Sequence, residues 1–339
     1  MKRLLTICAV AALVFALGNT ATAVTWNVPG DFETIQEAID DARVLDGHTI
    51  LVGPGSHAGA TVTKAVEIKG EGGAVINSGP DFATYWYTGK PYTTGFLFPW
   101  SDPGIANGTI ISHLSFETLD LPIYSRYTDD VTIEHCTFTS SNQAITNWNG
   151  NGWDISHNVI NGLRTMNGGG IGIFVGTRDA EASTANNNLI AHNTITGEVV
   201  VPDYEIDQYN EPGASPGYSV PGITLMSDRR YGKPAGTISG NRILKNKIAI
   251  TSNNPLHHFA CGIGLSDLGL LLEPPVADLL NNKVGFNDVR GMMEAGTPIS
   301  LYPEEKADAI AENNIISRNL GDDIPNRGHG VHPKMLFEE

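Results

Sequence analysis

The segment from Val201 to Pro221 gathers the carboxylates in this chain that are best placed to do chemistry. It contains three acidic residues at alternate positions, Asp203, Glu205 and Asp207. Clustered carboxylates can bind Ca²⁺, or act as the acid and base that cleave a glycosidic bond. Alternating acids in a segment rich in proline and glycine are more often simply solvated in a loop. Both interpretations stay open, and Ca²⁺ is the one cofactor that the sequence leaves open.

Charged residues also follow directly after the short apolar segment 222–226. Asp228 and Arg229 stand there, with Arg230 next in the chain. An arginine can bind the carboxylate of an acidic sugar through a charge-assisted hydrogen bond, or it can pair with the neighbouring acidic segment. Asp228 and Arg229 therefore join the three carboxylates as candidate catalytic residues.

A repeated pattern predicts the scaffold that must position these residues. Seven short segments each carry an apolar residue three positions before, and another two positions after, a shared central position. The central residues begin with two spacings of 22 and continue with spacings of 32 to 48. Such periods indicate stacked coils with inserted loops. The central residues are Leu114, Cys136, Asn158, Asn193, Asn241, Asn282 and Asn314.

The repeated asparagines predict a tight turn in each coil, because Asn tolerates left-handed backbone geometry. Coils stacked about 4.8 Å apart would let these side chains bond from coil to coil as a ladder. The spacing between Asn241 and Asn282 leaves room for a second coil without asparagine. Three short strands close each coil, and an amphipathic helix over 33–44 is expected to cap the first one.

One strand of each coil predicts a surface for sugar binding. If the isoleucines of these strands point inward, then Trp148, Phe174 and Met226 form a neighbouring outward strip, with Arg126 and Tyr302 in equivalent places. Aromatic faces suit the apolar faces of sugar rings. The alternative is that inserted loops cover the strip as a second small core, and the aromatic-rich insertion 80–99 is one such loop.

The first 23 residues have the layout of a secretory signal peptide. Lys2 and Arg3 precede the apolar run 4–17, and Ala21-Thr22-Ala23 offers a cleavage site. The run is too short to span a bilayer comfortably. We therefore expect a secreted protein, extracellular or periplasmic, with one domain over 24–335.

The net charge limits the classes of ligand that are expected, and the cysteine positions bear on disulfide formation. The formal net charge of −16 opposes binding to nucleic acid, and a polyuronate would need a locally basic groove. No later segment is apolar enough to predict membrane insertion, and a monomer is expected. Cys136 and Cys261 should lie several coils apart, beyond the roughly 7 Å Cα separation that a disulfide spans, so two free buried thiols are predicted.

Three N-terminal segments, 28–39, 49–55 and 66–72, resemble the opening of proteins in the pectin lyase-like superfamily, above all the secreted NosD-like β-helix repeat proteins. The resemblance implies an all-β fold, a right-handed parallel β-helix with three strands per coil. It does not imply an activity, because this fold hosts lyases, hydrolases, epimerases and adhesins. The Asp322-Asp323 and Gly328-His-Gly330 segments match polygalacturonase motifs but crowd into one short stretch.

Two functions remain after this comparison. The first is a secreted carbohydrate-associated protein that binds a polysaccharide along one strand face without catalysis. The alternative is a polysaccharide lyase or glycoside hydrolase whose site lies between the acidic segment and the Trp148–Met226 strip. The catalytic motifs of the superfamily's enzymes are not found in their usual arrangement, and this favours the first function.

Overall fold

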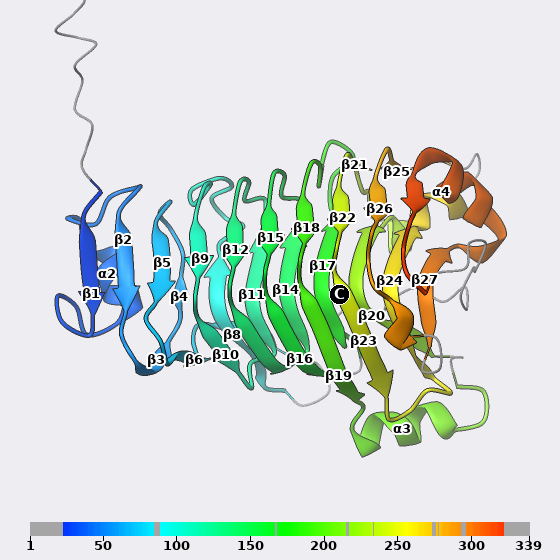
Figure 1. Cartoon of the computed structure of the whole chain (residues 1–339), viewed down its shortest axis with the longest axis horizontal. Coiled ribbons are helices and arrows are strands. Elements are labelled where there is room, and N and C mark those ends of the chain that lie inside the picture. The colour runs from blue at the N-terminus through cyan, green and yellow to red at the C-terminus, as the bar shows by residue number, and fades with distance from the viewer. Residues whose placement is uncertain are drawn as a thin grey trace, which may run out of the picture.

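The chain folds as a parallel β-helix, as the sequence predicted (Figure 1). The computed structural model describes residues 23–321, except 85–88, 167, 215–216, 233, 273–275, 277 and 293–295. The predicted signal peptide and the expected domain end at residue 335 lie outside these residues. Three parallel sheets, here called A, B and C, run the length of the stack, and the typical coil gives one strand to each in that order.

Sheet A consists of strands of three or four residues. They are β1 (Thr25–Val28), β2 (Thr49–Val52), β5 (Glu67–Gly70), β9 (Ile110–Ser112), β12 (Thr132–Glu134), β15 (Asp154–Ser156), β18 (Leu189–Ala191), β22 (Arg242–Leu244), β26 (Lys283–Gly285) and β28 (Ile315–Ser317). Sheet B consists of β3 (Gly55–Ala58), β6 (Ala74–Ser78), β10 (Ser115–Glu117), β13 (Thr137–Ser141), β16 (Val159–Arg164), β19 (Thr194–Val200) and β23 (Lys247–Ser252).

Sheet C has the longest strands and carries the candidate site. Its strands are β4 (Ala60–Thr61), β8 (Pro91–Phe98), β11 (Leu121–Arg126), β14 (Gln143–Trp148), β17 (Ile171–Thr177), β20 (Tyr218–Ser227), β24 (His258–Asp267) and β27 (Thr297–Tyr302). One further strand, β7 (Asp81–Thr84), pairs antiparallel with β8. A small separate pair joins β21 (Ile238–Ser239) to β25 (Leu279–Leu280).

Columns of β-branched residues hold the coils in register. In sheet A, Ile111 pairs with Ile133, Ile133 with Ile155, and Ile155 with Ile190, and all four are fully buried. A slip of one residue would turn such a column outward, so the repeated isoleucine fixes the pairing of each strand. β-Branched side chains also suit the half-buried surface of a strand.

The asparagines form two rows rather than the single row that the sequence predicted. One row follows the sheet A strands and the other precedes them, five residues earlier in each coil. Within a row, the Oδ1 of every asparagine after the first accepts hydrogen bonds of 2.8–3.0 Å from the backbone and side-chain nitrogens of the asparagine in the previous coil. The first row is Asn158, Asn193, Asn246, Asn287 and Asn319. The second row is Asn188, Asn241, Asn282 and Asn314.

The predicted register was therefore wrong from Asn241 onward. Asn193 bonds to Asn246, whereas Asn241 bonds to Asn188 and Asn282. The direct bond from Asn241 to Asn282 also shows that one coil, without a hidden second one, separates them. The error arose because an asparagine flanks both ends of each of these strands, and the two flanks share similar apolar neighbours.

Replacing Asn193 with alanine should lower the free energy of unfolding by about 1–3 kcal/mol. The change leaves the buried Nδ2 of Asn158 and the carbonyl of Ile155 without the hydrogen bonds they now make to this side chain. Urea denaturation measures the loss. The control is Asn187→Gly, since Asn187 is exposed, has a φ of 59° that glycine tolerates, and lies outside both rows. Equal losses in the two variants would contradict the assignment of Asn193 to a row.

Short helices close the stack at both ends. Helix α2 (Ile35–Asp40) is shorter than predicted and buries Ile35 and Ile39 over the first coil, with the Thr34 hydroxyl accepting a bond from the Glu37 backbone. Helix α4 (Ala307–Asn313) lies at the other end (Figure 1). Cys136 and Cys261 are free and buried, as predicted. Within the described residues, the helices are all too short or too polar to cross a bilayer.

Candidate functional site

The outward strip of sheet C is a second buried core, so the predicted aromatic platform for sugar was wrong. Trp148 is only 3% exposed, and Phe174 and Met226 are fully buried. The rings of Trp148 and Phe174 lie 4.4 Å apart, tilted against each other. The second of the two interpretations left open by the sequence, a small core beneath inserted segments, is the one observed.

The cover comes from the aromatic-rich insertion between sheets B and C. There the antiparallel pair of β7 and β8 brings Phe82 and Tyr92 onto the strip. The Phe82 ring lies 4.3 Å from that of Tyr124. Tyr302 packs against the same cluster and remains partly exposed. The strip thus stiffens the sheet C strands rather than offering them to a ligand.

Arg126 is a second member of the predicted strip that reaches solvent, with 23% of its side chain exposed. It is the last residue of β11, and its Nε donates a 2.8 Å hydrogen bond to the hydroxyl of the buried Tyr124. Its Nη1 lies 3.3 Å from Oδ2 of Asp179, just after β17. These contacts fix the guanidinium at the end of sheet C.

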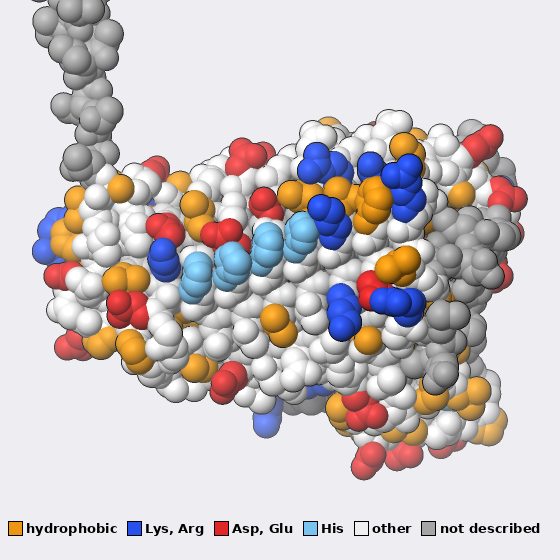
Figure 2. Space-filling view, viewed as in Figure 1, with side chains coloured by type: hydrophobic (Ala, Val, Ile, Leu, Met, Phe, Trp, Pro, Cys, Tyr) orange, Lys and Arg blue, Asp and Glu red, His pale blue; other side chains and the backbone are white. Residues whose placement is uncertain are grey.

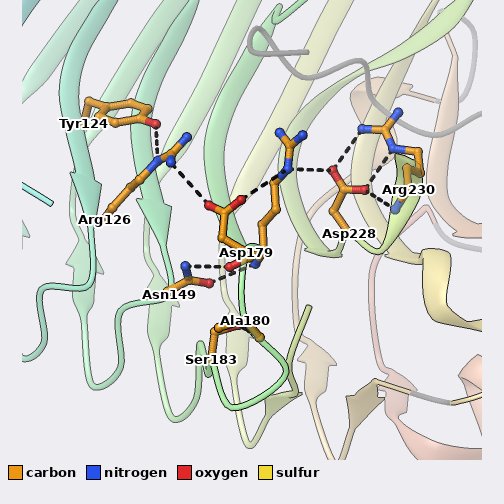
Figure 3. Close-up of polar contacts among 9 residues, drawn as sticks. Tyr124, Arg126, Asn149, Asp179, Ala180, Ser183, Asp228 and Arg230 are labelled. Atoms are coloured by element: carbon orange, nitrogen blue, oxygen red, sulfur yellow. Dashed lines mark hydrogen bonds and ion pairs between the residues drawn. The ribbon is translucent and has the colours of Figure 1, made fainter. Parts of the chain in front are cut away.

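Arg126 begins a line of alternating charges along one end of sheet C, from β11 past the ends of β17 and β20 (Figure 3). Nε of Arg178 lies 3.9 Å from Oδ1 of Asp179 and 4.0 Å from Oδ2 of Asp228. Arg230 closes the line with two hydrogen bonds to Asp228, at 3.0 and 3.1 Å. Three arginines therefore alternate with two aspartates. We call this set the charged line.

The charged line keeps Asp228 ionised. Burial alone would raise the pKa of Asp228, but hydrogen bonds from Arg230 and the charges of Arg230 and Arg178 outweigh it and hold the pKa below its ordinary value. Arg229, the other candidate in this stretch, points elsewhere. It binds both carboxylate oxygens of Asp278, at 2.7 and 3.0 Å. Asp228 and Arg229 are thus adjacent in sequence but belong to separate ion pairs.

The three predicted carboxylates of the acidic segment do not converge. The segment forms helix α3 (Asp203–Asn210) instead of a loop, so that Asp203 and Asp207 face solvent while Glu205 is fully buried. Its carboxylate accepts hydrogen bonds from the hydroxyls of Thr165 and Tyr218, at 2.7 and 2.5 Å. Glu205 therefore anchors the helix and cannot reach a substrate.

His258 completes the anchor beneath helix α3. It is the first residue of β24 rather than part of a loop, and its Nε2 lies 3.1 Å from Oε1 of Glu205. Nδ2 of Asn254 donates to its other ring nitrogen, which leaves Nε2 as the donor to Glu205. In the described part of the chain, no three His, Cys, Asp or Glu side chains are grouped to hold a metal. Ca²⁺ binding stays a prediction.

An open hollow of about 440 Å³ lies where sheet C turns into sheet A, beside the charged line. It is built by the connections of four successive coils. Its lining includes a phenol, amides, a carboxylate and a hydroxyl, contributed by Tyr127, Asn149, Asn151, Asp129 and Ser183. Asn149 belongs to both features, since it exchanges two 2.9 Å hydrogen bonds with the backbone of Arg178 (Figure 3).

Side-chain hydrogen bonds from coil to coil make the hollow rigid. Oδ1 of Asn107 accepts a 2.8 Å bond from the backbone of Asp129, and Oδ1 of Asp129 accepts a 2.7 Å bond from the backbone of Asn151. Asn151 accepts in turn from Asn186. Tyr127 holds a φ of 60° in the turn after β11, as Asn149 does in the turn after β14.

The sequence contained a signal for this hollow that our prediction missed. Asn107, Asp129 and Asn151 are spaced by 22 residues, as are Tyr127 and Asn149. This is the period that identified the coils themselves. Applying it to polar positions outside the asparagine rows would have placed these residues on one corner of the stack.

Comparisons with known proteins found only short or distant similarities. No protein-family model matches the chain. A cell surface glycoprotein of Methanothermus fervidus is 38% identical over 63 residues, which is 18% of this chain and 11% of that protein. The match therefore spans about a tenth of that relative.

Several solved structures share the general architecture. Rice weevil pectin methyl esterase is 13% identical, with a TM-score of 0.40, over 83% of this chain and 81% of that chain. The A-module of the mannuronan C-5 epimerase AlgE6 of Azotobacter vinelandii is 16% identical, with a TM-score of 0.37, over 85% and 86%. Likenesses this weak say nothing about activity or substrate.

Proposed function

We propose that this protein is an exported polysaccharide-binding protein that holds its glycan in the hollow at the corner between sheets C and A. The observation that carries the proposal is the lining of the hollow. Amide, carboxylate and hydroxyl groups converge there with the ring of Tyr127. A concave site with a few fixed polar groups and an aromatic surface suits a sugar, whose hydroxyls need partners and whose C–H faces need apolar contact.

Binding without catalysis is favoured by the state of the nearby carboxylates. Cleavage of a glycosidic bond takes one carboxylic acid and one free carboxylate. Asp179 and Asp228 are paired with arginines in the charged line. Burial raises the pKa of Asp267 to about 6, as in a general acid, but this side chain is only 1% exposed and accepts bonds from backbone nitrogens. Asp267 is therefore out of reach of a polymer.

An extracellular location agrees with two independent features. The first is the secretory signal pattern of the first 23 residues. The second is the short similarity to a protein described as a cell surface glycoprotein. Polysaccharides of a cell surface or an extracellular matrix are the partners that such a location supplies.

The proposal predicts a tenfold loss of affinity when the ring of Tyr127 is removed. A glycan array of the mature protein first selects a polysaccharide, and calorimetry then measures its affinity. Tyr127→Asn keeps a residue that tolerates the positive φ, and should weaken binding at least tenfold, about 1.4 kcal/mol. Thr118→Asn is the matched control, because Thr118 is exposed and has a φ of 60° at a different corner.

Two outcomes would argue against this function. Unchanged affinity in Tyr127→Asn, with the fold intact by circular dichroism, would remove the hollow as the binding site. Release of shortened or unsaturated sugars on long incubation would favour the alternative, a polysaccharide lyase or glycoside hydrolase. In that case Asp129→Asn is the variant to assay, since Asp129 is the carboxylate that lines the hollow.

A further inference from the structure

A row of seven residues occupies one turn of successive coils at the corner between sheets A and B. Each has a φ between 53° and 60°, and each directly precedes a residue of the first asparagine row or its equivalent. This position needs left-handed backbone, which asparagine, aspartate, glycine and histidine tolerate best. The occupants are His113, His135, His157, His192, Lys245, Phe286 and Arg318.

The four histidines form an exposed stack on the surface (Figure 2). Ring centroids lie 5.1, 5.1 and 4.9 Å apart from His113 to His192, and neighbouring planes differ by 26°, 21° and 6°. The spacing is that of the coils themselves. Asparagine would satisfy the turn equally well, so the turn geometry alone does not account for four imidazoles in a line.

The row continues into a group of basic side chains at the C-terminal half of the molecule (Figure 2). The register of sheet A places Arg242 beside Lys283 on neighbouring strands. Like charges in such positions repel each other and weaken a sheet. They gather here on a chain whose formal net charge is −16. The group consists of Arg242, Lys245, Lys247, Lys283, Arg290 and Arg318.

An aromatic ring and a carboxylate contact members of this basic group. Phe286 is 44% exposed, and the cations of Lys283 and Arg318 lie 5.9 and 5.4 Å from the centre of its ring. These cation–π contacts hold the two side chains beside an aromatic surface. Asp288 is paired with Arg290, at 2.8 Å, and so offsets part of the charge.

We propose that the histidine row and this basic group together bind an acidic polysaccharide that lies along the axis of the stack. The fixed cations supply binding at all pH values, and the histidines add to it as the solution becomes mildly acidic. An exposed aromatic ring among cations suits a polymer that has both anionic groups and apolar sugar faces. The strongly acidic remainder of the protein disfavours nucleic acid, whose backbone charge is denser.

The expected pH dependence has a definite sign. Imidazole is the side chain whose charge ordinarily changes between about pH 5 and 8. Protonation adds positive charge along the row, so affinity for a polyanion rises as pH falls. The register of sheets A and B identifies the charged residues that border the four histidines: Glu67, Lys69, Glu134, Asp154 and Lys247. Lys245 follows His192 in the row itself.

This surface is separate from the hollow of the proposed function. The chain passes from sheet A through the histidine turn to sheet B, and reaches the hollow only after sheet C. The two sites therefore lie at different corners of the coil. Tyr127→Asn should leave binding at the histidine row unchanged, so failure of either proposal is seen without the other.

Calorimetry with two polyanions tests the inference. The probes are polygalacturonate, which carries carboxylates, and dextran sulfate, whose charge does not vary with pH, with neutral dextran as the blank. Binding is measured at about pH 5.5 and about pH 7.5. We expect binding of at least one polyanion, about tenfold tighter at the lower pH. The polymer that binds identifies carboxylated or sulfated glycans as the class.

Three variants separate the parts of the surface. Changing all four histidines to asparagine keeps the turn geometry, and should abolish the pH dependence while sparing the affinity at about pH 7.5. Lys245→Gln combined with Lys283→Gln should weaken binding about tenfold at both pH values. Arg43→Gln removes a charge at the opposite end of the stack and should change nothing. Absence of binding to both polyanions, or equal losses in all three variants, would overturn the proposal.

Discussion

Replacing Trp148 with alanine should lower the free energy of unfolding by about 3–5 kcal/mol. The indole is 3% exposed and packs against Phe174 in the second buried core, on the outward side of sheet C. Its removal leaves a cavity that the neighbouring strands, held by parallel pairing on both sides, cannot close. Guanidinium denaturation, followed by fluorescence and circular dichroism, measures the loss.

Trp100→Ala is the matched control for this effect. Trp100 is 47% exposed and meets the ring of Phe82 edge-on, with ring centroids 5.3 Å apart. Its replacement should lower the free energy of unfolding by about 1 kcal/mol or less. A stable Trp148→Ala variant that loses glycan binding would reverse the assignment, because it would show that the strip is open to ligand and not a core.

Removal of the Glu205 carboxylate should lower the free energy of unfolding by about 3 kcal/mol or more, which is the second large effect expected. In Glu205→Ala the hydroxyls of Thr165 and Tyr218 and the ring of His258 all lose a buried acceptor. Each unsatisfied group costs about 1–3 kcal/mol, and bonds to a charged acceptor are the stronger ones. Urea denaturation gives the difference in unfolding free energy.

The same helix supplies the control for Glu205. Asp207 stands two residues further along α3 and faces solvent, so Asp207→Ala should change stability by roughly 0.5 kcal/mol or less. Similar losses in the two variants would mean that Glu205 does not anchor the helix. Glycan affinity should be unchanged in both variants, since neither residue lines the hollow.

The fold could be predicted from the sequence because successive coils need the same residue types at equivalent positions. Ile111, Ile133 and Ile155 recur at the coil period and each pairs with its neighbour, so the pattern directly encodes the stacking. The asparagine register failed at a point where the repeat is ambiguous. Asn241 and Asn246 both flank β22, and only the structure shows which of them meets Asn193.

The candidate site was harder to predict, for physical reasons. Alternation along β14 indicates correctly that Trp148 points away from the main core, but it does not say whether another segment covers it. Phe82 and Tyr92 reach the cluster through the local antiparallel pairing of β7 with β8, and Leu268 and Met166 join it from other connections, so the cover depends on insertions rather than on the repeat. Likewise Asp179 lies in a connection that is longer than those of the two coils directly before it, so the 22-residue period does not mark it.

Hydrogen–deuterium exchange with the array-selected polysaccharide tests the central claim, that glycan binds in the hollow between sheets C and A. Backbone amides are compared in the free and the bound protein. The account predicts slower exchange on binding in the connections that form the hollow, residues 103–107, 127–129, 149–151 and 180–184. Unchanged exchange in these connections, with protection confined to another face of the stack, would contradict it.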